Sequence, residues 1–437
     1  MKNGFWPRWT LKTEGTIMPD ERLPMGQTLV VGLQHVVAMF GSTVLAPILM
    51  GFNPNVAILF SGIATLLFFA VVRGRVPSYL GSSFAFIGPV LTTAGTGPDA
   101  NIALALGGII AAGVVYALIG VIVQVVGHRW VERVMPPVVT GAIVAAIGLV
   151  LAPIAISTAS GISPTTPDGD NFSRWVALVT VLAIGATAVY APGSLRRLPI
   201  LIGGAFGYFF YYVLTNIGGL GPAIDFTKVA EASWFGAPVF TAPVFSWRAV
   251  TLIAPVAIIL VAENLGHIKA IGAMTGRNYD SYLGRAFIGD GIATILSGAC
   301  GGTGVTTYAE NMGVMAVTRI YSTLIFVVAA VLALILGFSP KFGAVILTIP
   351  TPVLGGLSVV VFGLIAATAG RIWVENNVSF SNPRNLITVA VTLILGAGNF
   401  KLSVFGFTLE GIGTATFGAI ILYHFLRGFS EKKQPAF

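Results

Sequence analysis

Long apolar runs, separated by short stretches rich in glycine, proline or charge, dominate the chain. Most of these runs approach the ~20 residues that a helix needs to cross a bilayer. The pattern predicts fourteen segments, at 28–49, 56–73, 79–96, 102–126, 136–156, 174–191, 198–217, 249–270, 284–299, 308–318, 320–338, 345–369, 384–399 and 409–426. The third, ninth and tenth are short or interrupted by glycine. We therefore predict an all-α polytopic membrane protein with fourteen transmembrane segments.

Composition excludes a soluble globular domain. Hydrophobic residue types make up 55% of the 437 residues and charged types 9%, whereas soluble domains carry roughly 25% charged residues. The net charge of +8 comes from basic residues scattered singly between the apolar runs, which does not indicate a nucleic-acid-binding surface. The single cysteine, Cys300, rules out an internal disulfide bond.

The distribution of basic residues predicts the orientation in the membrane. Fourteen alternating segments place both termini on one side, and residues 1–27 lack the apolar core of a signal peptide. With both termini in the cytosol, 19 of the 24 Lys and Arg residues lie inside. The five outside are Arg174, Lys228, Arg248, Lys341 and Lys401. This bias follows the positive-inside rule and supports the segment count.

A weak internal repeat relates the two halves of the chain. At a constant offset of 215, three small or cyclic residues of the fifth segment match three of the twelfth: Pro137, Gly141 and Gly148 with Pro352, Gly356 and Gly363. Segments seven apart run in opposite directions, so the pattern predicts an inverted-topology repeat, which is typical of secondary transporters. Chance similarity between two apolar spans rich in glycine and proline is the alternative.

If the repeat is real, the third and tenth segments correspond. They contain PSYLGSSFAFIGP (77–89) and GGTGVTTYAENMG (301–313), both too short to cross as full helices. Irregular backbone at membrane depth is tolerated only where protein buries it or a cavity solvates it. We therefore expect short strands here, followed by half-helices whose free N–H groups and positive dipole ends face a binding site.

Few ionisable residues lie inside the apolar segments. They are Glu263, Asp290, Glu310, His35 and His267. Such a group costs ~2.5–3.5 kcal/mol at the centre of a membrane helix, so a functional role is the first interpretation. Glu263 and His267 are four residues apart and share a helix face, where they can hydrogen-bond each other. A purely structural pair is the alternative, and one Glu with one His does not make a metal site.

Glu310 opens the broken tenth segment and either accepts hydrogen bonds from a ligand or only caps the half-helix. Asp290 either braces its helix or takes part in proton coupling. Hydroxyl and amide groups at Thr306, Thr307 and Asn311 support the site or satisfy broken backbone. Flat rings for stacking, or for packing, come from Tyr79, Phe84, Phe86 and Tyr308.

Two carboxylates, a histidine and free N–H groups suit a planar, neutral ligand with ring donors and carbonyl acceptors. Uracil is such a molecule: its N–H groups would meet Glu263 and Glu310, and its carbonyls the backbone N–H groups of Phe84 and Ala309. A small anion would be repelled by the two carboxylates.

Several motifs resemble those of a known transporter family. The run from Glu310-Asn311-Met312-Gly313 to Thr318-Arg319 resembles the signature of the nucleobase–ascorbate transporter family. QHVVAMFGSTVLAP, PSYLGSSFAF and AENLGHIKA resemble its bacterial uracil permease branch. The resemblance covers nearly all the chain except its termini and residues 158–173.

The resemblance implies a seven-plus-seven inverted repeat with a core and a gate domain. The core domain would comprise 28–127 and 249–338, and the gate domain 128–217 and 339–427. An extracytoplasmic linker, 218–248, would join the halves, and 1–27 and 428–437 would be cytosolic tails.

The family's site residues carry over as expectations. The substrate would be held by Glu263, Glu310 and the backbone of Phe84 and Ala309, with Tyr308, Ser42 and Phe362 beside them. Ser42, Ala309 and Phe362 depart from the uracil permease pattern, which has Ala, Gly and Tyr there, whereas Glu310 stands where purine transporters tend to have Gln. Proton coupling would use His267 with Glu263, Glu310 and Asp290. Supporting positions are Asn311, His35 and Thr307.

The sequence thus predicts a proton–uracil symporter of the bacterial inner membrane that works by alternating access and forms a homodimer. Thymine and xanthine are the other candidate substrates, and no cofactor besides protons is expected. The alternative is an anion transporter or channel of the same fold. An enzyme or ATP-driven pump is disfavoured because neither H-E-x-x-H, nor a Ser/His/Asp grouping in the apolar spans, nor G-x-x-x-x-G-K-[ST] occurs.

Overall fold

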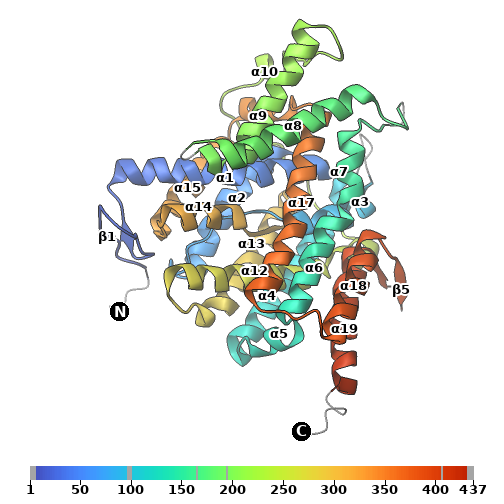
Figure 1. Ribbon diagram of the computed structural model, residues 1–437. Helices are drawn as coiled ribbons and strands as arrows, with labels where there is room; N and C mark the ends of the chain where they lie inside the picture. Colours follow the sequence, from blue (N-terminus) through green and yellow to red (C-terminus); the bar gives the residue numbers. More distant parts are fainter. Residues whose placement is uncertain (1–5, 96–100, 164–165, 193–194, 405–406, 431–437) are drawn as a thin grey trace.

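The computed structural model describes residues 6–95, 101–163, 166–192, 195–404 and 407–430, and within them the protein is almost entirely helical (Figure 1). The first half contains β1 (Thr10–Leu11), β2 (Glu21–Arg22), α1 (Met25–Met50), α2 (Pro54–Val71), β3 (Leu80–Ser82), η1 (Phe84–Phe86), α3 (Ile87–Ala94), α4 (Ile102–Val126), α5 (Arg129–Val134), α6 (Pro137–Val150), α7 (Ala152–Ala159), α8 (Asn171–Tyr190), η2 (Leu195–Arg197), α9 (Pro199–Tyr212) and η3 (Val213–Ile217).

The second half contains α10 (Thr227–Glu231), α11 (Trp247–Ile253), α12 (Val256–Thr275), η4 (Asp280–Tyr282), α13 (Leu283–Ala299), β4 (Val305–Thr307), α14 (Ala309–Thr318), α15 (Thr323–Gly337), α16 (Pro340–Leu347), α17 (Thr351–Glu375), α18 (Pro383–Ala397), β5 (Leu402–Val404), β6 (Phe407–Leu409) and α19 (Ile412–Ser430).

Each apolar segment predicted from the sequence overlaps at least one of these helices. The segment 102–126 matches α4 at both ends. The prediction was wrong for 345–369, where the chain breaks between α16 and α17 and α17 continues to Glu375. Pro350 explains the break, because proline donates no backbone hydrogen bond and cannot continue a helix. The apolar pattern alone did not register this interruption.

Eight helices of the described residues are long and apolar enough to cross a membrane, or nine if the bent pair of α15 and α16 counts as one span. The bend between these two helices is 81°. Three shorter apolar helices, at Phe84–Ala94, Pro383–Ala397 and Ile412–Leu426, accompany them. The fold is therefore that of a helical polytopic membrane protein.

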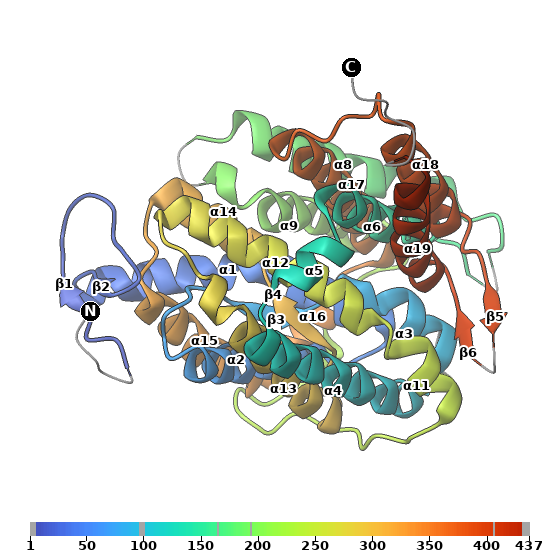
Figure 2. The same cartoon turned by 90° about the horizontal axis from the view of Figure 1, so that it is seen from below.

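The two broken segments meet at the centre of the molecule, where β3 and β4 form an antiparallel pair (Figure 2). Gly81 lies opposite Thr306, and all six strand residues are buried. Gly81 is required here because a Cβ at this position would lie 2.5 Å from the ring of Tyr308. The sequence prediction of short strands in these segments is confirmed. Each strand leads into a helix, η1 and α3 on one side and α14 on the other.

Glycines set the close approach of neighbouring helices. In the pair of α4 and α13, a Cβ on Gly120 would lie 2.6 Å from the backbone N of Ile288. In the pair of α2 and α15, a Cβ on Gly337 would lie 2.7 Å from Cα of Leu59. In membranes, where water no longer drives apolar helices together, such close backbone packing is a main source of association.

The N-terminal region packs onto the helices rather than extending from them. Ile17 is buried and pairs with Ile320 through backbone hydrogen bonds to Arg319 and Tyr321. Asp20 accepts a hydrogen bond from Arg277 at 2.7 Å. Residues 1–5 and 431–437 of the two predicted tails lie outside the described residues.

Two glycines related by the sequence repeat provide a matched test of helix packing. A Cβ on Gly148 would lie 2.5 Å from the carbonyl O of Phe362, whereas one on Gly363 would meet nothing within 4 Å. We expect Gly148→Ala to lower the thermal midpoint in detergent, because overpacking costs about 1–3 kcal/mol. Gly363→Ala is the control and should leave the midpoint unchanged or higher, since alanine favours the helix by about 1 kcal/mol. Equal behaviour of the two variants in a thermal size-exclusion assay would contradict the packing.

Candidate functional site

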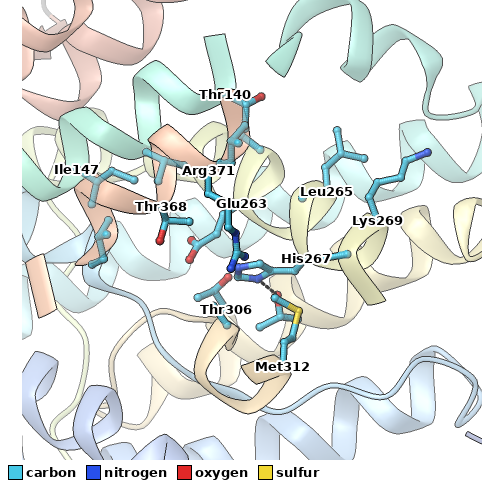
Figure 3. Close-up of a pocket in the computed structure, with 18 of the residues that line it drawn as sticks. Thr140, Ile147, Glu263, Leu265, His267, Lys269, Thr306, Met312, Thr368 and Arg371 are labelled. Atoms are coloured by element: carbon cyan, nitrogen blue, oxygen red, sulfur yellow. Dashed lines mark hydrogen bonds between the residues drawn. The ribbon is translucent and has the colours of Figure 1, made fainter. Parts of the chain in front are cut away.

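A cavity of about 730 Å³ opens beside the crossing of β3 and β4 (Figure 3). One wall comes from β3, η1, β4, α12 and the start of α14, and the opposite wall from α6 and α17. Of the residues predicted from the sequence, those that line it are Glu263, Glu310, His267, Phe84, Ala309, Tyr308, Thr306 and Thr307. A cavity of this size is in the range of small-molecule sites.

The two carboxylates that the sequence singled out face this cavity. Glu263 lies in the middle of α12, and Glu310 is the second residue of α14. They are 47 residues apart in the chain, and both line the cavity. Ser42 Oγ of α1 donates a hydrogen bond to Glu310 Oε1 and holds that carboxylate. The carboxylates thus come from two helices that only the fold brings together.

Free backbone donors lie on both sides of the strand crossing. Phe84 begins η1, and Ala309 begins α14, where the first N–H groups of a helix have no intrahelical acceptor. Within the part of the chain that the structure describes, neither N–H donates to a protein group. Both residues line the cavity. A ligand that carries both carbonyl acceptors and N–H donors can therefore bind in this cavity, with its carbonyls at these backbone N–H groups and its N–H groups at the carboxylates.

Aromatic rings divide into two groups. Phe84 and Tyr308 line the cavity, and Tyr308 Oη is fixed between Thr43 Oγ1 at 3.0 Å and the carbonyl O of Ser82 at 3.0 Å. Phe362 does not line the cavity but packs edge-on behind Phe84, with ring centroids 5.7 Å apart. Tyr79 and Phe86, which the sequence also suggested as stacking rings, are fully buried in the core.

His267 makes a different hydrogen bond from the one expected. Its Nδ1 lies 2.8 Å from Thr307 Oγ1 on β4, and Thr307 in turn donates to Asn264 Oδ1 at 3.4 Å. The expected bond between His267 and Glu263 is not among the hydrogen bonds of the described residues. The strand thus provides a nearer partner than the residue one turn away on the same helix.

Asp290 is buried behind the cavity in a polar cluster. Its Oδ2 accepts from Asn264 Nδ2 at 2.7 Å and from Tyr116 Oη at 3.3 Å. A chain of hydrogen bonds therefore runs from Asp290 through Asn264 and Thr307 to His267. Asn264 and Tyr116 were missed by the sequence analysis, although an amide and a phenol inside apolar runs were a signal that could have found them.

His35 and Asn311 lie away from the cavity. Asn311 Nδ2 donates to the carbonyl O of His35 at 3.0 Å and lies 3.0 Å from His35 Nδ1. The His35 ring packs against Phe326, with centroids 4.7 Å apart. These contacts tie α1 to α14 and so fix the helix that carries Glu310.

Several polar lining residues were not singled out from the sequence or were given no definite role. Thr140 of α6 and Thr368 and Arg371 of α17 line the wall opposite Glu263 (Figure 3). Thr306 Oγ1 on β4 is buried without a hydrogen-bond partner and also borders the cavity. A threonine or arginine in a membrane helix near the cytosolic side is common, so the sequence carried no signal for Thr140, Thr368 or Arg371, whereas Thr306 was named without a definite role.

Charged residues surround the open end of the cavity. Lys269 Nζ pairs with Glu132 of α5 at 3.0 Å and with Asp280 at 2.6 Å. Partial burial would raise the pKa of Asp280, but the hydrogen bond and charge of Lys269 and the charge of His128 outweigh it and lower that pKa below its ordinary value. Among the described residues no group of three or more His, Cys, Asp or Glu could hold a metal ion.

Sequence comparisons place the chain among permeases. A family model described as the permease family matches residues 26–405. The chain is 61% identical over 426 residues to a protein of Escherichia coli (strain K12) named pyrimidine permease RutG, covering 96% of this chain and 94% of that protein. It is 42% identical over 411 residues to the uracil permease of Paenibacillus larvae, covering 93% and 95%. The uracil permease of Escherichia coli (strain K12) is 39% identical over 409 residues, covering 92% of each chain.

Solved structures with the same fold are more distant in sequence. The transmembrane domain of the cyanobacterial bicarbonate transporter BicA matches with a TM-score of 0.66 at 18% identity, covering 91% of this chain and 97% of that one. A murine Slc26a9 anion transporter matches with a TM-score of 0.66 at 14% identity, covering 96% and 69%. These matches show the polytopic helical fold. A shared fold does not identify the ligand, which has to be inferred from the residues of the cavity.

The contribution of the buried polar cluster behind the cavity to the stability of the fold can be measured. Asn264→Ala removes the shorter hydrogen bond to Asp290 and leaves a buried carboxyl group short of a donor, which costs about 1–3 kcal/mol. We expect a lower thermal midpoint in detergent. Asn376→Ala, which removes an exposed amide bonded only within its own helix, is the control and should stay within about 0.5 kcal/mol. An unchanged midpoint for Asn264→Ala would show that the cluster does not stabilise the fold.

Proposed function

Because the chain belongs to the nucleobase–ascorbate transporter family of permeases, we propose that it imports uracil or a closely related pyrimidine together with a proton. Its relatives are permeases over nearly their whole length, so the protein is a multi-pass membrane transporter and not an enzyme. The proposal concerns the substrate, the coupling ion and the mechanism.

One observation carries the choice of substrate. The cavity offers two carboxylates, Glu263 and Glu310, together with the free N–H groups of Phe84 and Ala309. Uracil has two ring N–H donors and two carbonyl acceptors in one plane, so all four of its polar groups find complementary partners. Phe84 also lines the cavity, and we expect a flat ligand to stack on its ring. A site that hydrogen-bonds each polar group of its ligand rejects analogues that lack one.

The same residues favour pyrimidines over purines as substrates. Ser42 holds the Glu310 carboxylate in place, and an ionised carboxylate accepts hydrogen bonds but donates none. Glu310 therefore favours a ring edge with N–H groups. Thymine keeps that edge and adds a methyl group, whereas xanthine adds a second ring, so we rank them after uracil as substrates.

Proton coupling follows from the cost of moving charge through a low-dielectric region. A neutral substrate leaves the charges of Glu263 and Glu310 uncompensated, and protonation of one of them lowers the cost of transit. His267 lies one helical turn from Glu263, and its hydrogen bond to Thr307 connects the cavity to Asp290. Groups this close titrate jointly, so the proton belongs to the set and not to one residue.

Alternating access is supported by the symmetry of helix packing. Under the inverted repeat, α4 corresponds to α15 and α13 to α2, and the observed pairs α4–α13 and α2–α15 obey that relation. Gly141 approaches Trp373 while Gly148 approaches Phe362, so α6 and α17 run antiparallel, as repeat partners of opposite direction would. We therefore propose fourteen spans, with a core domain carrying both carboxylates and a gate domain contributing α6 and α17.

The direction of opening fits the predicted orientation. Lys269, Glu132 and Arg371 at the open end of the cavity belong to segments whose basic residues we assigned to the cytosol. The cavity would then face the cytosol, and uracil would leave the two carboxylates by passing Thr368 and Arg371. We place the protein in the bacterial inner membrane with both termini inside and, following the family resemblance, as a homodimer with no cofactor besides protons.

Radiolabelled uracil uptake into proteoliposomes tests the substrate and the site. We expect uptake that rises when an inward proton gradient is imposed. Glu263→Gln and Glu310→Gln should each lose at least about tenfold in uptake, because removing a charged hydrogen-bond partner of a ligand costs roughly 1.5–3 kcal/mol. Glu14→Gln, on the exposed N-terminal region, is the matched control and should retain the parent rate. Gradient-driven uptake that persists in both cavity variants would refute the assignment of the site.

A competition assay separates the nucleobase proposal from the anion alternative suggested by the shared fold. Excess unlabelled uracil should abolish uptake, thymine should compete more weakly, and bicarbonate or sulfate should not compete. Two carboxylates repel an anion, so competition by bicarbonate at concentrations that leave the proton gradient intact would support anion transport instead.

A further inference from the structure

The linker between the two halves, residues 218–248, exposes large aromatic rings in an unusual concentration. Trp234 is 79% exposed, Phe235 75%, Trp247 65% and Phe245 64%. Within this segment the regular structure is α10 and the first two residues of α11, Trp247 and Arg248, so Trp234, Phe235 and Phe245 do not belong to an amphipathic helix. A linker surrounded by water would not keep such a set of rings in contact with solvent, because exposed apolar patches of this kind mark interaction surfaces.

The linker is not a loose connection. The backbone N of Gly236 donates to the carbonyl O of Phe338, and the N of Lys341 donates to the O of Ser233, each at 2.9 Å. Further along, the N of Val244 donates to the O of Ala103 at the start of α4, at 2.8 Å. The linker is therefore fixed along the ends of α15, α16 and α4. Figure 1 shows α10, the helix of the linker, on the side of the molecule away from both termini.

The surface next to the linker is the apolar face of a membrane helix. Beyond Ala103, α4 exposes Val114, Leu118 and Val125, and α4 is the most apolar of the helices long enough to span a membrane, with a mean hydropathy of 2.6. Figure 2 shows the linker running along the edge of the molecule beside α4 and α13. The linker packs on the same face of α4, since a Cβ on Gly107 would lie 2.5 Å from the carbonyl O of Val244, and Val114, Leu118 and Val125 follow Gly107 at helical spacing. The exposed rings of the linker therefore adjoin the exposed apolar face of α4.

Cations accompany the rings. Lys341 Nζ lies 5.2 Å from the centroid of the Trp234 ring, and Arg248 follows Trp247 directly and is exposed. Together with Lys228 on α10, they make up three of the five basic residues predicted on this side of the membrane, and they outnumber the two acidic residues of the linker, Asp225 and Glu231. Trp rings with neighbouring Lys and Arg match the headgroup layer of a phospholipid bilayer, where rings meet the acyl boundary and cations meet phosphates.

We propose that the linker 218–248 lies in the headgroup layer of the leaflet opposite the termini and binds phospholipid through its rings and its cations. The occupant is lipid because the patch continues the lipid-facing surface of α4 and carries charge complementary to phosphate. Since the linker is fixed to α4, α15 and α16, this contact sets the depth of those helices in the bilayer. The proposal does not depend on which substrate is transported.

Tryptophan fluorescence of the full-length protein in phosphatidylcholine–phosphatidylglycerol vesicles tests the proposal. The chain has seven tryptophans, so the emission of Trp234 is obtained by subtracting the spectrum of Trp234→Phe from that of the parent. We expect this difference emission to lose most of its intensity when the vesicles contain lipid brominated near the glycerol end of the acyl chains. Lipid brominated near the methyl end and aqueous iodide should each quench it far less.

Trp130→Phe is the control, since Trp130 is half-buried with its indole Nε1 inside the protein, and its difference emission should depend less on the position of the bromine atoms than that of Trp234. Strong quenching of the Trp234 difference emission by iodide, without quenching by brominated lipid, would overturn the proposal and leave the linker in water. Protection from both quenchers would also overturn it, because a second copy of the chain or another protein would then cover the ring.

The cations are tested by the phospholipid that remains on the purified protein. Mass spectrometry should find less phosphatidylglycerol relative to phosphatidylethanolamine on the Lys228→Gln, Lys341→Gln double variant than on the parent. Each Lys near an anionic surface contributes about 1 kcal/mol, so the ratio should fall several-fold. An unchanged ratio would show that the cations of the linker do not bind anionic lipid.

Discussion

Backbone polar groups inside a membrane must find partners within the protein, and the antiparallel pairing of β3 with β4 is where this chain meets that requirement at its two broken segments. A helix satisfies its own backbone, but a strand at membrane depth needs another strand. Each half of the chain therefore needs the strand of the other half to satisfy its backbone at membrane depth. The half-helices that follow, η1 and α14, begin with N–H groups that the pairing leaves free, and these groups face the cavity beside Glu310.

The polar side chains around the crossing depend on the same pairing. Thr307 of β4 binds His267 of α12 and Asn264, which binds Asp290 of α13. On the opposite face of the strand, Tyr308 joins Thr43 of α1 to Ser82 of β3. Thr307 of β4 and Tyr308, which follows it, thus join α1, α12 and α13 to the strand crossing. These contacts fix α12, which carries Glu263, and the start of α14, which carries Glu310.

Different residues determine the fold and the choice of ligand. Glycine contacts such as that of Gly120 with Ile288 determine how closely the helices pack, and bicarbonate and anion transporters share the resulting architecture at 18% and 14% identity. Those contacts say nothing about a substrate. The choice between an anion and a neutral heterocycle depends on whether the crossing is flanked by carboxylates, and here two of them line the cavity.

The sequence by itself determined the helices, since partition into lipid depends on local runs of apolar residues, and it determined the broken segments, because glycines and polar residues interrupt such runs. It also identified Glu263, Glu310 and His267, because an ionisable residue in an apolar run is costly wherever the chain folds. The tertiary structure alone decided that His267 binds Thr307, that Asp290, His35 and Asn311 lie behind the cavity, and that Thr140, Thr368 and Arg371 form its far wall. The physical reason is range: the cost of burying a residue is a property of that residue, whereas a hydrogen-bond partner or an opposing wall comes from a distant segment whose position no local pattern encodes.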